Sequence, residues 1–475
     1  MLKKNILFIF LFIVFNTFSQ TALITSFPEN NQLYKRDTAT NKANVLIAGS
    51  VDQSTGCSSL TLKIFKNSIL AETIVNNLVY DASGNVDFTF NYGIQAELST
   101  YKFQLFANNT NLEAEADNIV AGDVYIVTGQ SNSIRNRFVN APFPYQSNFI
   151  RSYLLESNSW STNPNPFIFG GIGYRFAENI VDNQQIPIAL LNGGEGGKSI
   201  SHFFRNDADN YDVDTNYGRL LTRYTNAGFV PGDVRALIWY QGEANGGGPG
   251  DLYASSFSSM YDDWEVDFTP EKYYAFQVHQ GCGVNITSEI PEYFRTLPKT
   301  YPKISTISTN GALQGADNCH YYYTNGYEVL ANRLYNLVTF DFYNSGINSG
   351  IYSPNIEHVR FSNISKTQIK FELSPETDTY SWENGIENDF ILEGSPIAIT
   401  NGYIEGNTVT LNLSGIVTTS STKLTYLGRN KAEEPFIKNQ NNIGMFSFKD
   451  IPIIETTNLP VSKTDGSWTY YYKNT

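Results

Sequence analysis

The pattern of apolar and polar positions changes twice along the chain. In residues 20–118, short runs such as 60–65 and 101–106 alternate apolar and polar side chains, and turn residues such as 81–85 separate them. Alternation with a period of two is typical of strands with one buried face. Because no long helical period interrupts these runs, we predict an N-terminal β-sandwich module.

Between residues 119 and 345, strand-like runs alternate with helix-like runs. The predicted strands are residues 124–127, 186–191, 234–240, 273–278 and 304–308. The predicted helices are residues 174–182, 217–227, 253–266 and 326–339. This order predicts an α/β domain with a five-stranded parallel sheet covered on both faces. A functional site is then expected at the carboxyl ends of the strands.

A strand pattern returns after residue 345, where residues 369–373 and 408–413 alternate cleanly. We therefore predict that residues 346–475 form a C-terminal β-rich module, interpreted as a second β-sandwich.

The N-terminus has the three parts of a signal peptide. Residues 1–4 carry two lysines, residues 5–18 are almost entirely apolar, and Thr17 and Ser19 place small residues before Gln20. Residues 1–19 are therefore predicted to be removed on export, which makes the protein periplasmic or secreted. The apolar stretch is too short for a stable membrane anchor, and no later stretch predicts a membrane span.

Composition narrows the expected partners. The formal net charge is −14 and the isoelectric point is about 4.8, and an acidic chain without a basic patch argues against nucleic acid binding. Aromatic residues make up 14% of the chain, with 31 Tyr and 32 Phe. This richness suits secreted β-rich domains and sugar binding, although ordinary strand propensity explains most of it.

The cysteines bear on both cross-linking and metal binding. In an exported protein, one pair among Cys57, Cys282 and Cys319 can form a disulfide. Cys282 and Cys319 are the favoured pair, because each follows a predicted strand of the same domain; whether they are bridged stays open. The sequence has no Cys-x-x-Cys motif and no histidine pair at ligand spacing, so we expect no metal site.

Four of the predicted strands are followed by candidate catalytic residues. The first ends at Ser131 within the turn residues 129–133, the second in the glycine-rich residues 193–197, and the third in residues 241–243 (Gln-Gly-Glu). The fifth strand is followed by residues 317–320 (Asp-Asn-Cys-His). Strand–Gly–Ser turns are common, so Ser131 alone is a weak signal. The convergence of these strand ends on one sheet edge makes it a candidate nucleophile.

A nucleophilic serine needs an adjacent base. The four histidines of the chain are His202, His279, His320 and His358. Only His320 has a carboxylate three residues earlier, and Asp317 can hold the imidazole tautomer and stabilise the imidazolium. His279 ends the fourth strand and is the rival base, whereas His202 follows the glycine loop and could contact substrate. We predict Ser131, His320 and Asp317 as the catalytic residues.

Other residues at these strand ends are candidates for stabilising an oxyanion or supporting the site. Backbone N–H groups approach an oxyanion closely where no side chain intrudes, which favours Gly196 and Gly197 as donors. The amide of Gln241 either adds a donor or only caps its strand end. Glu243 is either a structural carboxylate or helps to orient the histidine, and Asn132 is expected to brace the serine turn.

With these motifs, the chain resembles the SGNH/GDSL hydrolase superfamily. It looks more narrowly like the sialate O-acetylesterase type and is similar to the family 6 carbohydrate esterases. The matching stretches are residues 122–132 (GDVYIVTGQSN), 196–200 (GGKSI), 238–245 (IWYQGEAN), and 317–320 (DNCH) followed by Gly326 and Tyr327. The resemblance covers about residues 119–340. The N-terminal module, through residues 28–31 and 35–37, also resembles the module that precedes the catalytic domain in these esterases.

The resemblance implies a three-layer α/β/α domain that needs no metal or organic cofactor. It implies Ser131 as nucleophile, His320 as base and Asp317 as its partner. The oxyanion would be held by the N–H groups of Ser131 and Gly196 and by the side chain of Gln241.

The chain also departs from the family pattern. Gln241 stands where the superfamily has asparagine, as is usual in this subfamily. Ser133 stands where many relatives have methionine, Lys198 replaces the more usual threonine, and residues 246–248 form a glycine insert. The last two departures bear on the substrate pocket.

These observations predict an exported serine esterase that removes O-acetyl groups from carbohydrates. The sugar stays open among sialic acid, xylan, pectin and algal polysaccharides. One alternative is a non-catalytic carbohydrate-binding protein on the same scaffold, against which the complete set of Ser131, His320 and Asp317 argues. Another is an esterase or lipase for other acyl chains, which the small and polar strand-end loops do not favour.

Overall fold

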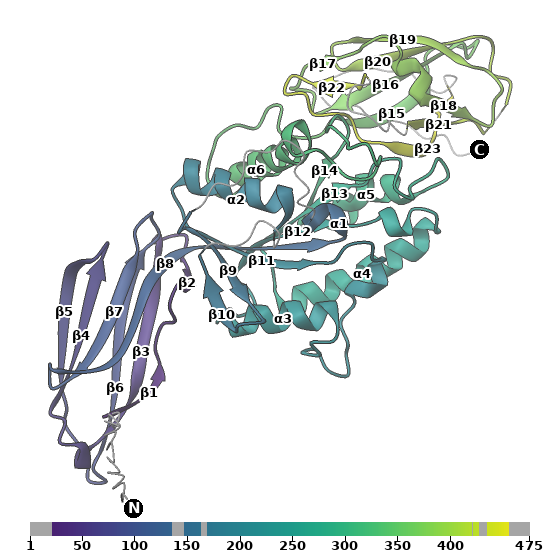
Figure 1. Cartoon of the computed structure of the whole chain (residues 1–475). Helices are drawn as coiled ribbons and strands as arrows, with labels where there is room; N and C mark the ends of the chain where they lie inside the picture. The colour runs from purple at the N-terminus through teal and green to yellow at the C-terminus, as the bar shows by residue number, and fades with distance from the viewer. Residues whose placement is uncertain (1–20, 135–146, 163–168, 420, 427–434, 456–475) are drawn as a thin grey trace, which may run out of the picture. The chain divides into compact units, whose positions relative to one another are not determined.

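A computed structural model describes residues 21–134, 147–162, 169–419, 421–426 and 435–455, and the signal peptide predicted for residues 1–19 lies outside them. The chain divides into two units (Figure 1). The first comprises the residues up to Asn30, Asn44–Ile94 and Ser99–Ile119. The second comprises Asn31–Ala43, Gln95–Leu98 and the chain from Val120 onward. The domain boundaries proposed from the sequence, at residues 118/119 and 345/346, stay predictions.

The first unit consists of antiparallel strands. One sheet has the order β1-β3-β6, formed by β1 (Ala22–Ser26), β3 (Lys42–Asp52) and β6 (Asn85–Gln95). In a second group of antiparallel strands, β4 (Ser59–Lys66) lies between β5 (Ile69–Asn77) and β7 (Tyr101–Ala107). Strand β7 also pairs with the first part of β8 (Asn111–Gly129). Alternate side chains of β7, from Tyr101 to Ala107, are buried. The β-sandwich arrangement itself stays a prediction.

The second unit contains a large mixed sheet with the order β10-β9-β11-β8-β12-β13-β14. Its further strands are β9 (Ile150–Leu154), β10 (Ser159–Ser161), β11 (Ile188–Gly194), β12 (Val234–Tyr240), β13 (Lys272–Gln277) and β14 (Ile304–Ser308). Neighbours from β9 to β14 are parallel, β10 is antiparallel to β9, and β2 (Leu33–Lys35) joins β8. The predicted five-stranded parallel sheet is therefore too small. Strand β9 was not predicted, because it buries the polar residues Arg151 and Ser152.

Helices connect the parallel strands. They are α1 (Ser131–Ile134), α2 (Gly170–Gln184), α3 (Asn216–Asn226), α4 (Gly250–Asp267), α5 (Ile290–Thr300) and α6 (Glu328–Phe342). Short helical turns occur at η1 (Gln53–Thr55), η2 (Ile200–Phe203), η3 (Glu243–Asn245), η4 (Tyr323–Tyr327) and η5 (Ile386–Asp389). In Figure 1, α2 and α6 lie on one side of the parallel strands and α3 and α4 on the other. The three-layer arrangement implied by the resemblance stays a prediction. Helix α5 was not predicted, because Pro291 and Pro298 interrupt its pattern.

The central strands position the site because they are buried on both faces. All seven residues of β12 are buried, as are residues 119–129 of β8. Their apolar side chains join those of α2 and α6 in one hydrophobic core. The ends of these strands are therefore fixed points from which loops can present reactive groups.

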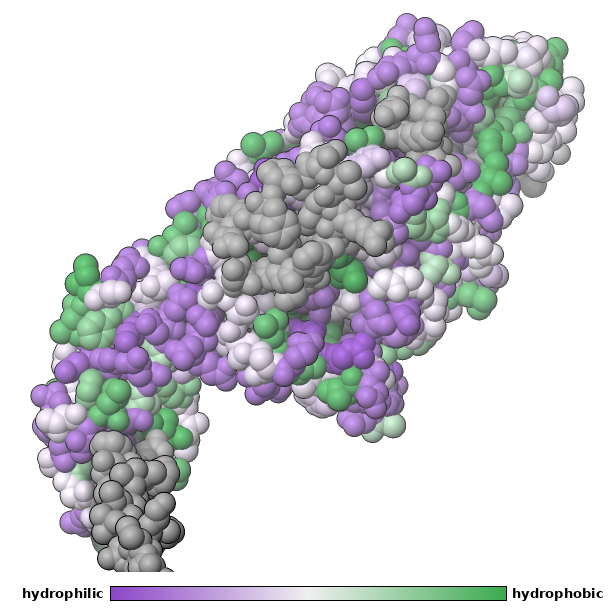
Figure 2. Space-filling view, in the orientation of Figure 1, coloured by the Kyte–Doolittle hydropathy of each residue, from purple (hydrophilic) through white to green (hydrophobic). Residues whose placement is uncertain are grey.

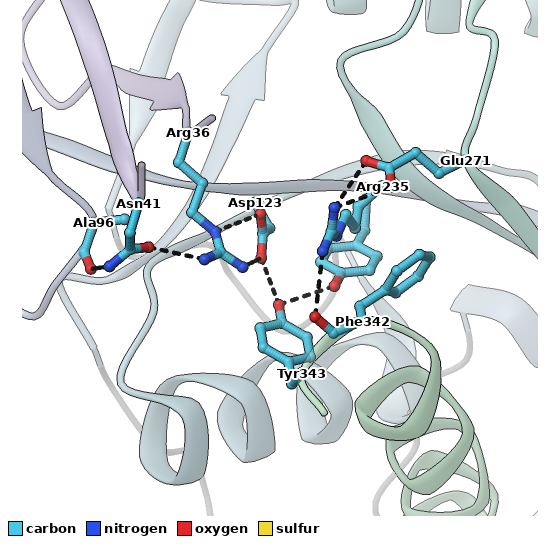
Figure 3. Close-up of polar contacts among 9 residues, drawn as sticks. Arg36, Asn41, Ala96, Asp123, Arg235, Glu271, Phe342 and Tyr343 are labelled. Atoms are coloured by element: carbon cyan, nitrogen blue, oxygen red, sulfur yellow. Dashed lines mark hydrogen bonds and ion pairs between the residues drawn. The ribbon is translucent and has the colours of Figure 1, made fainter. Parts of the chain in front are cut away.

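A buried ion pair holds β8 at Asp123, within the strand that leads to Ser131 (Figure 3). Arg36 Nε and Nη2 each donate to one carboxylate oxygen of Asp123 at 2.8 Å. Tyr343 O–H donates to Asp123 Oδ2 at 2.6 Å, and the Asp123 side chain is only 1% exposed. Asn41 accepts from Arg36 Nη1 and donates to the Ala96 carbonyl oxygen. Arg36 thus links three segments of the second unit around β8.

The C-terminal strands have a hydrophobic core of their own. One sheet has the order β15-β16-β20-β19, formed by β15 (Asn355–Phe361), β16 (Gln368–Ser374), β20 (Thr408–Leu413) and β19 (Ile399–Glu405). A second has the order β18-β21-β23, formed by β18 (Phe390–Glu393), β21 (Lys423–Tyr426) and β23 (Phe448–Pro452), and β17 (Tyr380–Ser381) pairs with β22 (Lys438–Asn439). Gln277 donates to the Ser447 carbonyl oxygen and accepts from the Ser447 N–H, both at 2.9 Å. This pair of hydrogen bonds fastens the segment before β23 to the end of β13.

The surface mixes hydrophilic residues with scattered hydrophobic ones on the face shown in Figure 2. Among the described residues, none of the helices combines the length and the apolar character needed to cross a membrane.

Candidate active site

The turn that carries Ser131 depends on a glycine, Gly129. Gly129 ends β8 with a φ of +126°, and a Cβ there would lie 2.2 Å from the carbonyl oxygen of Tyr240. Left-handed φ combined with this close approach requires glycine. Gln130 N–H then donates to the same carbonyl oxygen at 2.8 Å, and Ser131 opens α1. The tight strand–helix junction holds Ser131 at the carboxyl edge of the sheet.

Ser131, His320 and Asp317 form a continuous hydrogen-bonded chain. His320 Nδ1 lies 2.7 Å from Asp317 Oδ2, and His320 Nε2 lies 3.0 Å from Ser131 Oγ. An ionised carboxylate can only accept, so Nδ1 carries the proton and Nε2 accepts from the serine hydroxyl. Both distances lie within the range for a base that takes a proton from a nucleophile.

The electrostatics of Asp317 keep it charged. Burial alone would raise the pKa of this carboxyl, but the His320 side chain and the backbone N–H groups of His320 and Cys319 outweigh it and lower the pKa to about 2. The two backbone donors reach Asp317 Oδ1 at 3.0 and 3.1 Å. Asp317 is therefore ionised at neutral pH, with one oxygen held by the backbone and the other facing His320.

The glycine loop after β11 lies beside the nucleophile. Gly194 pairs with Gly129 in the sheet, and Glu195 N–H donates to the Gly129 carbonyl oxygen at 2.9 Å. A Cβ at Gly196 would lie 3.6 Å from the Cβ of Ser131. Gly197 has a φ of +73° and would meet nothing within 4 Å. Gly196 is thus next to Ser131, whereas Gly197 is at the open side of the loop.

Gln241 is fully buried, and its amide already has partners. Its Nε2 contacts the Asn245 side chain at 2.8 Å, and the Gln130 side chain and Lys198 carbonyl oxygen at 3.2 Å each. Its Oε1 accepts from Tyr253 O–H at 2.9 Å. An amide has two N–H hydrogens for these three acceptors. Donation to an oxyanion would require Gln241 to release one of them, and its oxyanion role stays a prediction.

Asn132 and Glu243 form a buried polar connection between the serine turn and the histidine loop. Asn132 Nδ2 donates to Glu243 Oε1 at 2.7 Å and to the Cys319 carbonyl oxygen at 3.1 Å. Tyr327 O–H donates to Asn132 Oδ1 at 2.9 Å. Burial raises the pKa of Glu243 to about 7. Asn132 therefore braces the serine turn and the histidine loop together, and Glu243 contacts Asn132 while His320 pairs with Asp317.

The other histidines lie in different surroundings. His202 Nε2 lies 2.9 Å from Glu195, whose carboxylate also contacts Lys198 and Arg219. His279 is buried and contacts Gln314 and the Gln280 carbonyl oxygen; burial lowers its pKa to about 4, so it is neutral. His358 lies in β15, among the C-terminal strands.

Some supporting residues were missed by the sequence analysis. Gln130 Oε1 accepts from Gln241 Nε2, from the Ala244 N–H at 3.1 Å and from the Gly242 N–H at 3.4 Å, and so ties the serine turn to the end of β12. Tyr327, which holds Asn132, stands within the last matching stretch but gave no signal for this role. Only the position of Gln130 next to the nucleophile could have suggested its function.

The disulfide considered for Cys282 and Cys319 is present, and Cys57 is a buried free thiol. Within the part of the chain that the structure describes, no group of three or more His, Cys, Asp or Glu side chains could hold a metal ion.

Comparison with known proteins places this geometry in a family. Residues 121–339 match the model of a carbohydrate esterase family described as sialic acid-specific acetylesterases. These residues belong to that family. The domain is accordingly that of a carbohydrate O-acetylesterase. A search of the curated proteins found no match.

Solved structures similar to this chain include one with the same fold. A carbohydrate acetylesterase from Xanthomonas citri is 15% identical, with a TM-score of 0.62, and the alignment covers 90% of this chain and 99% of that one. A protein from Arabidopsis thaliana is 18% identical, with a TM-score of 0.38, over 46% of this chain and 99% of that one. A family two carbohydrate esterase from Cellvibrio japonicus is 11% identical, with a TM-score of 0.30, over 68% and 95%. At these identities, the first of the three supports the fold alone.

Proposed function

We propose that the protein is an exported serine esterase that removes O-acetyl groups from carbohydrates through an acetyl-Ser131 intermediate. The hydrogen-bonded chain from Ser131 Oγ through His320 to Asp317, at 3.0 and 2.7 Å, carries this proposal. The predicted signal peptide supports export. The family match supports an acetylated carbohydrate as the substrate.

In the first half of the reaction, His320 Nε2 takes the hydroxyl proton while Ser131 Oγ attacks the acetyl carbonyl carbon. The tetrahedral oxyanion is held by the N–H groups of Ser131 and Gly196, with Gln241 as the further predicted donor. Collapse breaks the bond to the sugar oxygen, and His320 returns the proton to this leaving alkoxide. Asp317 stabilises the imidazolium between these transfers.

In the second half, water replaces the sugar. His320 takes a proton from the water, whose oxygen attacks the acetyl-serine carbonyl carbon. Collapse releases acetate and returns the proton to Ser131 Oγ. Every proton transfer in both halves passes through His320 Nε2.

The test is acetate release by the mature protein on a panel of acetylated sugars and an aryl acetate. We expect release from both, and loss of about 10³-fold or more in Ser131→Ala and His320→Ala. Ser157→Ala, which changes an exposed hydroxyl between β9 and β10, is the matched control and should retain wild-type rates.

A folded wild-type protein that binds glycans but releases no acetate would refute the esterase proposal in favour of a non-catalytic binding protein. A preference for long-chain acyl esters over acetyl sugars would refute the substrate class while leaving Ser131 as nucleophile.

A further inference from the structure

The loop that carries Asp317 and His320 joins β14 to α6 at the protein surface. Inside the loop, Gly315 N–H donates to the His320 carbonyl oxygen at 2.6 Å, and Asn318 N–H donates to the Gly315 carbonyl oxygen at 3.0 Å. The Asp317 side chain is 48% exposed. These contacts fix the shape of the loop but not its distance from Ser131. That distance must be set by contacts from other elements.

One such contact follows the base: Tyr321 is buried, and its O–H lies 3.1 Å from the O–H of Tyr240 at the end of β12. Two others meet at Cys319, the residue directly before the base. Its carbonyl oxygen accepts from Asn132, the residue directly after the nucleophile, at 3.1 Å. Its sulfur is bonded to Cys282 across a sequence separation of 37 residues, with the Cα atoms 4.6 Å apart. One contact is a single hydrogen bond, and the other is covalent.

Cys282 is itself well anchored to the sheet. It follows β13 by a few residues and lies in a tight turn, where Gly281 and Val284 exchange two backbone hydrogen bonds at 2.8 and 2.9 Å. Val284 is buried, as is His279 at the base of the turn. The turn also packs against Gly246 after β12, because a Cβ there would lie 2.6 Å from the Gly283 carbonyl oxygen. The disulfide therefore ties the loop that carries His320 to a turn that is anchored beside the sheet.

We propose that the Cys282–Cys319 disulfide is a positioning element for the catalytic histidine, holding His320 Nε2 within reach of Ser131 Oγ. The proposal rests on the esterase mechanism above. Its consequence is sensitivity to dithiols. A dithiol thiolate attacks one sulfur of the bridge, and its second thiol closes a cyclic disulfide, so that two electrons and two protons pass to Cys282 and Cys319. Cys319 then keeps the hydrogen bond from Asn132 but loses its covalent support.

The first experiment compares Cys282→Ser with the wild-type protein on an aryl acetate. Misplacing a catalytic group by about 1 Å costs about 10²-fold in rate. We expect kcat to fall at least about tenfold while KM stays within about twofold, because the glycine loop and the oxyanion donors are untouched. Asp317 and His320 stay paired within one loop, so the pH dependence of kcat/KM should keep its shape.

The second experiment treats the wild-type protein with dithiothreitol under conditions that raise its free thiols from one to three. Near-ultraviolet circular dichroism monitors the fold, and a fluorophosphonate monitors the reactivity of Ser131. We expect reduction to reproduce the low kcat, reoxidation to restore it, and Cys282→Ser to be indifferent to the dithiol. Cys57→Ser, which changes the buried free thiol of the first unit, should respond like wild type.

The inference is overturned if the reduced, folded wild-type protein keeps its kcat, or if activity is lost only in parallel with the circular dichroism signal. Reduction of the wild-type protein also decides the question if Cys282→Ser does not fold. An oxidised wild-type protein without any activity would instead refute the proposed esterase function, so that the two failures are distinct.

Discussion

Replacing Asp317 by asparagine tests which carboxyl group supports the catalytic histidine. Asp317 Oδ2 lies 2.7 Å from His320 Nδ1, and Oδ1 is held by the N–H groups of His320 and Cys319. In Asp317→Asn the amide oxygen can keep these backbone donors, which turns the NH2 group toward Nδ1. Two donors then face each other unless His320 moves its proton to Nε2, and that tautomer cannot accept from Ser131.

The size of the effect follows from this geometry. A hydrogen bond to a charged group contributes about 1.5–3 kcal/mol, and about 1.36 kcal/mol is a factor of ten in rate. Asp317→Ala should therefore lower kcat/KM about 10- to 150-fold. Asp317→Asn should cost more, because it also favours the wrong tautomer. The loss should stay below the roughly 10⁴-fold effect at a fully buried triad carboxylate, because Asp317 is 48% exposed.

The assay is kcat/KM for an aryl acetate from pH 5 to pH 9. Asp317 is ionised throughout this range, since its pKa is lowered to about 2 by hydrogen bonds that outweigh burial. The loss in Asp317→Ala and Asp317→Asn should therefore persist across the whole range. Glu243→Gln should cost less than Asp317→Asn. A loss below threefold in Asp317→Asn, or a larger loss in Glu243→Gln, would refute the assignment of Asp317.

Three further predictions concern buried polar groups. Arg36→Met leaves the Asp123 carboxylate with Tyr343 as its remaining side-chain hydrogen-bond donor. The free energy of unfolding, measured in denaturant, should fall by about 3–5 kcal/mol, and Arg36→Met/Asp123→Asn should recover part of this loss. An unchanged unfolding midpoint in Arg36→Met would contradict this. The pKa of Glu243 is raised by burial to about 7. Between about pH 4.3 and pH 7 the carboxyl is ionised only in the unfolded state, so the free energy of unfolding of the wild-type protein falls by up to about 3–4 kcal/mol. The melting temperature of Glu243→Gln, relative to that of the wild-type protein, should therefore be higher at pH 8 than at pH 5. An equal difference at both pH values would count against the raised pKa of Glu243. If the Gln241 amide reaches the oxyanion, Gln241→Ala should lower kcat by about 10²–10³-fold at unchanged KM. A loss below tenfold would mean that Gln241 only holds Gln130 in place.

The sequence predicts fold elements best where the burial pattern is simple. β12 and the end of β8 are buried on both faces, so they are continuous apolar runs that are recognised at once. β9 was missed because Arg151 and Ser152 are buried within it and carry no apolar signal. Arg151 Nη1 donates to the Asn31 carbonyl oxygen at 3.0 Å. A partner 120 residues away along the chain cannot be inferred from a local pattern.

The candidate site could likewise be predicted only in part. The proximity of Ser131, His320 and Asp317 could be predicted because each follows a strand whose end must lie at one sheet edge, and because the separation of three residues lets Asp317 contact His320 directly. Their catalytic roles stay predictions. The partners of Asn132 were not found. Asn132 contacts Glu243, Tyr327 and the Cys319 carbonyl oxygen, which lie 111, 195 and 187 residues away. Their meeting depends on how three loops pack, and no spacing in the sequence records it.

The reactive groups of the site are supported in two different ways. Ser131 stands on a junction that the sheet itself fixes, because Gly129 and Gln130 are locked to Tyr240 of the neighbouring strand. His320 stands on a loop beyond the sheet, and its local bonds to Asp317 move with it. On one side the loop is held by Tyr321, which is buried and lies 3.1 Å from the O–H of Tyr240. A base in that position needs attachments from outside its own loop. The Asn132 hydrogen bond and the disulfide both attach to Cys319, one residue from the imidazole, where a restraint acts most directly on the distance between Nε2 and the serine oxygen.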